Sequence, residues 1–168
     1  MVKQSLKPIV QILTPKNVSA KNLILLDRDG TINKDLGYTH KLSDLFILKK
    51  NLEIINHFID AESKVFCITN QSGIGRGLFT EREATTFNKA LHRELKKYRI
   101  KVEVFYICPH TPESKCTCRK PGTLMIEMAL SYSNIPLSNS IFIGDSKSDL
   151  AACRKLGLKF IRVPKNNI

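Results

Sequence analysis

The sequence predicts an α/β domain built around a doubly wound parallel sheet. Short apolar runs rich in Ile, Val and Phe alternate with longer segments whose apolar residues recur at helical spacing. Strands that alternate with helices in this way form a parallel sheet covered on both faces. The chain has 168 residues, of which 42% are hydrophobic, and this is enough to bury the core of one globular domain.

Five apolar runs are predicted to be buried strands, because each is short and rich in β-branched or aromatic residues. They are residues 22–26, 64–69, 102–107, 140–144 and 158–163. Four segments with helical spacing lie among them, at residues 51–61, 80–98, 123–132 and 147–157. The second helix is predicted to begin with a capping box formed by Thr80 and Glu83, and the fourth to end at Gly157 as its C-cap.

Residues 1–21 are interpreted as a basic N-terminal extension that precedes a domain spanning residues 22–168. The extension carries four lysines and no acidic residue. Its apolar patch, IVQIL, is too short for the core of a secretory signal or for a membrane span. We therefore expect a cytoplasmic monomer that has no membrane partner.

The formal charge of +12 is spread along the whole chain rather than gathered in a polybasic tail. Two interpretations stay open at this point. The charge forms a solvated basic surface, or it creates a positive field that attracts anionic substrates.

Polar side chains follow the ends of the predicted strands, which is where ligands bind in doubly wound sheets. Asp27, Asp29 and Asp145 would form an oxygen cluster suited to Mg²⁺. One carboxylate could attack a phosphorus atom and form an aspartyl-phosphate, while a second, two residues on, could protonate the leaving oxygen and then activate water. A hydroxyl from Thr69 or Ser72, together with the cation of Lys120, could bind the phosphoryl oxygens.

A second cluster of possible ligands lies in the segment CPHTPESKCTC. Cys108, His110, Cys116 and Cys118 offer three thiolates and an imidazole, the usual ligands of a closed tetrahedral zinc site. Four protein ligands leave zinc no open position, so we expect structural Zn²⁺. A disulfide framework is not expected in a reducing cytoplasm.

The strand-end residues resemble the four motifs of the haloacid dehalogenase superfamily of phosphatases, over about residues 22–163. These motifs are DRDGT from Asp27, Thr69, Lys120 and Asp145. The resemblance implies a Rossmann-like fold of the haloacid dehalogenase type, with a short zinc-binding loop and no large cap domain. It implies that Asp27 is the nucleophile and Asp29 the acid/base. It also implies that Mg²⁺ is held by Asp27, Asp145 and the carbonyl of Asp29, and that Thr69 and Lys120 are catalytic.

Other segments resemble two groups within that superfamily, the D-glycero-D-manno-heptose 1,7-bisphosphate 7-phosphatases and the histidinol-phosphate phosphatases. These segments are the zinc loop, DLGY, TNQSG and CRKP. This similarity implies that a small phosphorylated sugar is bound by Asp35, Gly37, Tyr38, Asn70, Gln71, Ser72 and Arg119. Arg76 is a further possible anion contact. These groups usually place Lys or Arg directly after the fourth-motif acid, whereas here Ser146 follows and Lys147 comes one residue later.

We expect removal of the 7-phosphate of D-glycero-D-manno-heptose 1,7-bisphosphate during synthesis of lipopolysaccharide precursors. Histidinol-phosphate hydrolysis in histidine biosynthesis is the alternative. Polynucleotide 3′-phosphatase activity is less favoured, because only 7% of residues are aromatic and no basic stretch alternates with stacking aromatics. We therefore expect no nucleic-acid partner. A zinc-stabilised binding module without catalysis would leave the four strand-end motifs unexplained.

Overall fold

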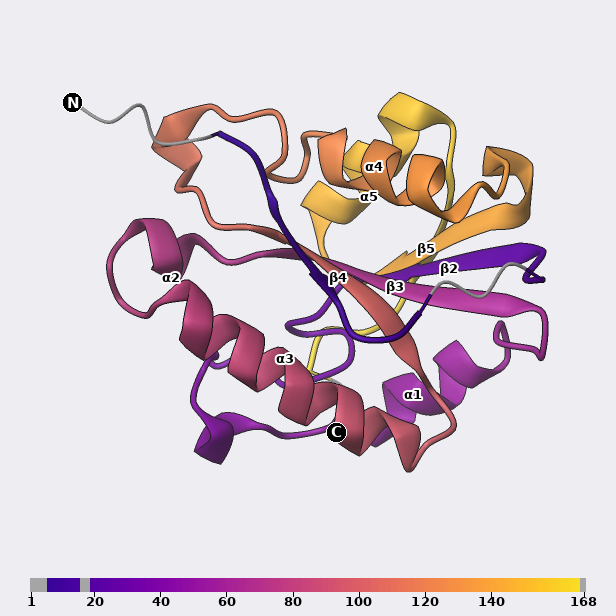
Figure 1. Cartoon of the computed structure of the whole chain (residues 1–168), viewed down its shortest axis with the longest axis horizontal. Helices are drawn as coiled ribbons and strands as arrows, with labels where there is room; N and C mark the ends of the chain where they lie inside the picture. The colour runs from indigo at the N-terminus through magenta and orange to yellow at the C-terminus, as the bar shows by residue number, and fades with distance from the viewer. Residues whose placement is uncertain (1–5, 16–18, 167–168) are drawn as a thin grey trace.

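The computed structural model describes residues 6–15 and 19–166, and within these ranges six strands form one sheet (Figure 1). The strand order across the sheet is β1-β4-β3-β2-β5-β6. The strands are β1 (Ile9–Ile12), β2 (Asn22–Leu26), β3 (Ser63–Asn70), β4 (Val102–Cys108), β5 (Ser140–Gly144) and β6 (Lys159–Arg162). All neighbours pair in parallel except β1, which runs antiparallel to β4. The predicted fold class is confirmed.

The helices cover both faces of this sheet, as Figure 1 shows. They are α1 (Lys49–Asn56), α2 (Ser72–Gly75), α3 (Glu81–Lys96), α4 (Leu124–Ser133) and α5 (Lys147–Leu156). Side chains of α4 and α5 pack on one face of the strands, and those of α1 and α3 pack on the other. Strand residues therefore alternate between two cores, and Leu, Ile, Val and Phe together make up most of both.

The five strands and four long helices predicted from the sequence are all present, with ends that differ by a few residues. The capping box of Thr80 and Glu83 is formed at the start of α3. Gly157 ends α5 in the left-handed conformation, with φ +69°, which glycine adopts without a steric penalty.

Strand β1 was not predicted. Its side chains alternate between half-buried and exposed, and Gln11 interrupts the apolar run. The structure explains this glutamine, because its amide donates to the carbonyl of Thr85 at 2.9 Å and accepts from Asn88 at 3.1 Å, both on α3. The rest of the predicted extension lies partly outside the described residues, and the domain boundary at residue 22 stays a prediction.

Two connections extend beyond the carboxyl ends of the strands, residues 27–48 and 109–123. Each contains one 3₁₀ turn, at Leu42–Asp44 and Pro112–Ser114. In the described part of the chain neither connection forms a large cap domain, so loops and short helical turns lie over the strand ends. None of the helices described is both long and apolar enough to cross a membrane.

Candidate active site

The carboxyl ends of β2, β3 and β5 meet at a small pocket of about 110 Å³. Its lining residues are Asp27, Asp29, Thr69, Asn70, Lys120, Ser146 and Ser148. The strands are parallel, so residues that are far apart in the sequence leave the sheet at one edge. Both catalytic carboxylates proposed from the sequence, together with Thr69 and Lys120, therefore contribute to one pocket.

Lys120 is a buried residue in the lining of this pocket, and its ammonium contacts three oxygens. It donates to Asp27 Oδ1 at 2.6 Å and to the carbonyl of Ile68 at 2.8 Å, and it pairs with Asp149 Oδ1 at 2.7 Å. Burial lowers the pKa of Lys120, but the Asp149 and Asp27 carboxylates outweigh burial and raise the pKa above its usual value. The side chain is therefore a fixed cation beside the Asp27 carboxylate.

From the sequence alone, Asp149 is expected on the solvated face of the predicted helix at residues 147–157, with contact to a metal-bound water as the alternative. The structure corrects the first expectation, because Asp149 is fully buried. The start of α5 explains the difference. Ser146 caps this helix, accepting from the Asp149 amide at 3.1 Å, while Asp149 Oδ2 accepts from the Ser146 amide at 3.1 Å. This capping box turns the Asp149 carboxylate inward to Lys120, and it gives Ser146 a structural function at the position that follows Asp145.

Three carboxylates, from Asp27, Asp145 and Asp149, have oxygens within 4.8 Å of one another. Burial raises the pKa of Asp27 well above its usual value; Lys120 opposes this effect, and the two neighbouring acids add to it. A divalent cation would relieve this repulsion, and carboxylate oxygens are ligands that Mg²⁺ prefers. Both Asp149 oxygens already have partners, Lys120 and Ser146, so Asp27 and Asp145 are the carboxylates of this cluster that fit Mg²⁺. The Asp29 carboxylate is not one of the three clustered groups.

The Asp29 carboxylate is instead held by three side chains. Buried Arg28 pairs with it at 2.9 Å, Asn33 donates to it at 2.9 Å and Gln71 donates to it at 2.7 Å. Gln71 also donates to Thr69 Oγ1 at 2.8 Å, which links two of the predicted catalytic residues. The orientation of Asp29 is therefore set by its neighbours rather than by solvent.

Arg28 was not assigned a function from the sequence. Its side chain is fully buried, and its guanidinium lies over the Phe87 ring at 4.8 Å and donates to the Thr39 carbonyl at 2.6 Å. It thereby joins Asp29 to the loop at residues 34–39. The one available signal was a basic residue placed between two acids in a segment that must be buried, because such a charge needs a partner.

The predicted substrate-binding residues lie in and around the pocket. Asn70 holds the backbone of Lys120, accepting from its amide at 3.0 Å and donating to its carbonyl at 3.1 Å. Asp35 and Gly37 belong to the loop at residues 34–39, where the Asp35 carboxylate accepts from the Gly37 amide at 3.0 Å. Tyr38, in the same loop, is about half exposed, at 47%.

The remaining predicted contacts lie beside α2 and the cysteine-rich loop. Ser72 is half-buried at the start of α2. Arg119 is also half-buried and donates to the His110 carbonyl at 3.3 Å. Arg76 pairs with Glu113 at 3.7 Å. Neither Ser72 nor the two arginines line the small pocket itself, so any contact with a substrate would involve the part that extends out of it.

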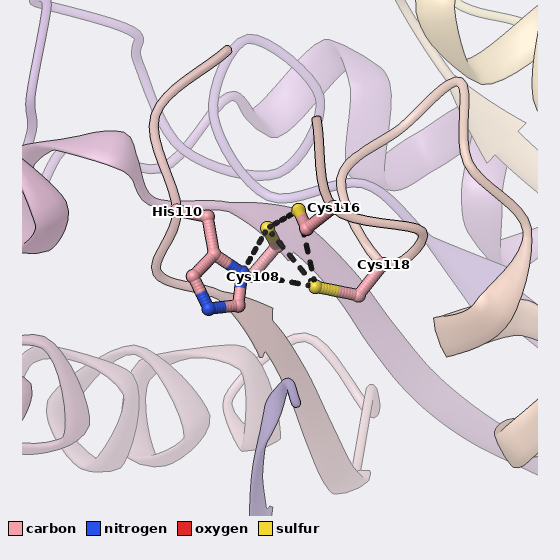
Figure 2. Close-up of side chains that lie close together, drawn as sticks. All are labelled: Cys108, His110, Cys116 and Cys118. Atoms are coloured by element: carbon pink, nitrogen blue, oxygen red, sulfur yellow. Dashed lines mark hydrogen bonds between the residues drawn. The ribbon is translucent and has the colours of Figure 1, made fainter. Parts of the chain in front are cut away.

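The four predicted zinc ligands converge at one point, with their sulfurs and the His110 ring nitrogen turned toward one another (Figure 2). Sulfur–sulfur distances are 3.3 Å for Cys108–Cys118, 3.5 Å for Cys116–Cys118 and 3.7 Å for Cys108–Cys116. A tetrahedral site with Zn–S bonds of about 2.3 Å requires about 3.8 Å between sulfurs. The cluster therefore fits zinc, and its cysteines are free thiols rather than disulfides.

Burial raises the pKa of the thiols of Cys108 and Cys118, the latter to about 11. A thiol in such a position is protonated at neutral pH unless a cation stabilises the thiolate. Cys118 directly precedes Arg119 and Lys120, so the geometry of this cluster also sets the position of the fixed cation in the pocket.

Comparisons with known proteins support the resemblance to the haloacid dehalogenase superfamily. The family model described as HAD-hydrolase-like matches residues 117–167. A protein of Thermoplasma acidophilum named "Probable D-glycero-D-manno-heptose-1,7-bisphosphate 7-phosphatase" is 39% identical over 152 residues, which cover 90% of this chain and 95% of that protein. The D-glycero-beta-D-manno-heptose-1,7-bisphosphate 7-phosphatase of Haemophilus ducreyi is 34% identical over 146 residues, which cover 83% and 80% of the two chains.

A solved structure is also similar over most of its length. It is the D,D-heptose 1,7-bisphosphate phosphatase from B. bronchiseptica, complexed with magnesium and phosphate, with a TM-score of 0.77 and 32% identity over 87% of this chain and 83% of that one. The resemblance inferred from the sequence motifs is thereby confirmed. The chain belongs to the haloacid dehalogenase-like phosphoric monoester hydrolases and, within them, to the family of the D-glycero-D-manno-heptose-1,7-bisphosphate 7-phosphatases.

Proposed function

We propose that this protein is a Mg²⁺-dependent phosphatase that removes the 7-phosphate of D-glycero-D-manno-heptose 1,7-bisphosphate through an aspartyl-phosphate. The observation that carries the proposal is the buried ion pair of Asp27 and Lys120, at 2.6 Å, in a pocket at the strand ends. The names of the relatives support the substrate. The product would supply synthesis of lipopolysaccharide precursors.

Asp27 is the proposed nucleophile. A carboxylate oxygen of Asp27 forms a bond to phosphorus while the bond from phosphorus to the sugar oxygen breaks, and Asp29 gives its proton to that leaving oxygen. Asp29 then accepts a proton from the water that attacks the aspartyl-phosphate. Inorganic phosphate leaves and Asp27 is regenerated.

Two residues would stabilise the phosphoryl group during both steps. The Lys120 ammonium and the Thr69 hydroxyl can donate to its oxygens, and the buried site strengthens such contacts. Asp27 and Asp145, with the carbonyl of Asp29, would hold Mg²⁺, which when bound supplies positive charge that offsets the charge of the phosphoryl oxygens. The four residues of the cysteine-rich cluster would hold a structural Zn²⁺.

The sugar would lie outside the small pocket, against the loop at residues 34–39 and against Ser72 and Arg119. Arg119 would contact the ring region, and Arg76 or Lys147 would contact the distal phosphate. A cytoplasmic location and a monomeric state stay predictions from the sequence.

A direct comparison of substrates tests the proposed function. The kcat/KM for heptose 1,7-bisphosphate is expected to exceed those for heptose 7-phosphate and histidinol phosphate by at least about tenfold, which is about 1.4 kcal/mol of transition-state binding. Arg119→Ala should reduce this preference more than it slows hydrolysis of p-nitrophenyl phosphate, because the aryl ester lacks the sugar ring that Arg119 would contact. If histidinol phosphate is the best substrate, the heptose assignment is wrong and the catalytic assignment is unaffected.

The acid/base function of Asp29 predicts a dependence on the leaving group. Asp29→Asn keeps the size of the side chain and an oxygen that can accept from Arg28, but it has no proton to give. In the first turnover, Asp29→Asn should slow release of the sugar alcohol by about 100-fold or more and slow release of p-nitrophenol much less, because nitrophenolate leaves without protonation. Rapid-quench measurements of both products give the comparison. Equal losses on the two esters would show that the acid/base assignment is wrong.

A further inference from the structure

The segment that follows β6, residues 163–166, lies against the loop that carries the catalytic carboxylates. The Val163 amide donates to the Gly144 carbonyl at 3.0 Å, and the Asn166 amide donates to the Gly30 carbonyl at 3.1 Å. Asn51 donates to the carbonyl of Pro164 at 3.0 Å. These bonds attach the segment to the loops that follow β2 and β5, so it forms part of the wall around the strand ends.

The same segment holds the loop at residues 34–39 through Asp35. The amide of Asp35 donates to Asn166 Oδ1 at 2.8 Å, and Asn166 Nδ2 donates to the Asp35 carbonyl at 3.2 Å. Lys165 Nζ pairs with Asp35 Oδ2 at 2.7 Å. The backbone of Asp35 is thus fixed by Asn166, and its carboxylate is left to Lys165 and to the amide of Gly37.

The backbone beside Lys165 is close to the cluster of acids at the catalytic pocket. Gly30, which accepts from Asn166, lies so near Asp145 that a Cβ on this glycine would be 2.7 Å from Asp145 Oδ2. The pKa of Lys165 is raised first by Asp35 and, to a smaller extent, by Asp145 and Asp27. Lys165 therefore lies in the wall around the strand ends, where its flexible side chain pairs with the loop at residues 34–39.

Lys165 and Lys120 differ in how firmly they are held. The Lys120 side chain is 3% exposed and has several fixed partners, whereas the Lys165 side chain is 58% exposed and, among the residues that the structure describes, has one acidic partner. Exposed ion pairs of this kind are weak, because water competes for both charges. Such a lysine can leave its carboxylate partner for a phosphate, which carries a larger negative charge.

We propose that Lys165 is a specificity-determining residue, whose ammonium leaves Asp35 and binds the non-transferred phosphate of a sugar bisphosphate. This inference rests on the proposed function, and it adds a cation that the sequence motifs do not contain. Asn166 would keep the loop in place while Lys165 changes partner, because its bonds to Asp35 involve only the backbone of that residue.

The test compares Lys165→Gln with Lys165→Arg, and with Lys159→Gln as a matched loss of an exposed lysine on β6. For heptose 1,7-bisphosphate, Lys165→Gln should raise KM at least about tenfold and change kcat by no more than about twofold, because it removes binding that is equal in the ground and transition states. Its kcat/KM for p-nitrophenyl phosphate should stay within about twofold of wild type, because this ester has no second phosphate. Lys165→Arg and Lys159→Gln should both resemble the wild-type protein.

Two results would overturn the inference. An unchanged KM for the bisphosphate would mean that Lys165 does not contact it, and equal losses on both esters would mean that Lys165 only holds the loop. Failure of the wild-type protein to hydrolyse the bisphosphate would instead contradict the proposed function. In that case the bisphosphate is used as an inhibitor of p-nitrophenyl phosphate hydrolysis, and its inhibition constant should still rise at least about tenfold in Lys165→Gln. An unchanged inhibition constant would again overturn the inference.

Discussion

Asp27→Asn is expected to abolish phosphatase activity, with a loss of at least about four orders of magnitude in kcat, in the range measured when a covalent nucleophile is removed. An amide oxygen is a far poorer nucleophile than a carboxylate, so this substitution removes the group that would attack phosphorus. The loss should be seen with heptose 1,7-bisphosphate and with p-nitrophenyl phosphate alike, because both must form the same aspartyl-phosphate. Steady-state kinetics with the two esters measures it.

The fold should survive this substitution. Asparagine has nearly the size of aspartate, and Lys120 would keep its ion pair with Asp149 at 2.7 Å. The melting temperature and the zinc content should therefore match those of the wild-type protein. Glu53→Gln, a similar loss of charge on an exposed position of α1, is the control and should stay fully active. Retention of even about a tenth of wild-type turnover would rule out Asp27 as the nucleophile.

The second large effect is expected from the cysteine cluster. The purified protein should contain about one zinc per chain, and structural zinc sites contribute on the order of 10 kcal/mol to the folding of their segment. Cys116→Ser removes one of three thiolates, so the zinc content should fall and residues 108–118 should lose their fixed conformation. Elemental analysis and thermal unfolding, each with and without a chelator, measure these changes.

Phosphatase activity should fall when zinc is lost, because Cys118 is followed directly by Arg119 and Lys120. A shift of this segment would move the Lys120 ammonium away from Asp27, which it now contacts at 2.6 Å. Cys153→Ser is the control, since this buried cysteine lies on α5 outside the cluster and should leave the zinc content unchanged. A zinc-free protein with full activity and an unchanged melting temperature would contradict the structural function of zinc.

Much of this molecule could be predicted from local sequence patterns. The strands that form the centre of the sheet are continuous apolar runs, because both of their faces are covered, and such runs are visible without knowledge of their partners. The capping box at Thr80 and the C-cap at Gly157 depend on residues within one turn of the helix. The order of parallel strands then implies that Asp27, Thr69 and Asp145 leave the sheet at the same edge.

The predictions that failed concern residues whose partners are distant in the sequence. Gln11 reads as a break in an apolar run, and only the position of α3 shows why strand β1 can contain it. Asp149 has the spacing of a solvated helix residue, and only its contact with Lys120 shows that its carboxylate is buried. In both cases a polar side chain is satisfied by a group that tertiary packing brings to it.

The sequence by itself therefore determined the fold class, the strand-end residues and the composition of the cysteine cluster, because each is encoded in a short pattern whose meaning depends on neighbouring residues. Only the tertiary structure decided that Arg28 joins Asp29 to the Thr39 carbonyl, and that Lys165 pairs with Asp35 across most of the chain. Such contacts depend on where loops from different strands meet. Their geometry is set by the packing of the whole sheet and by the need of each buried charge for a partner.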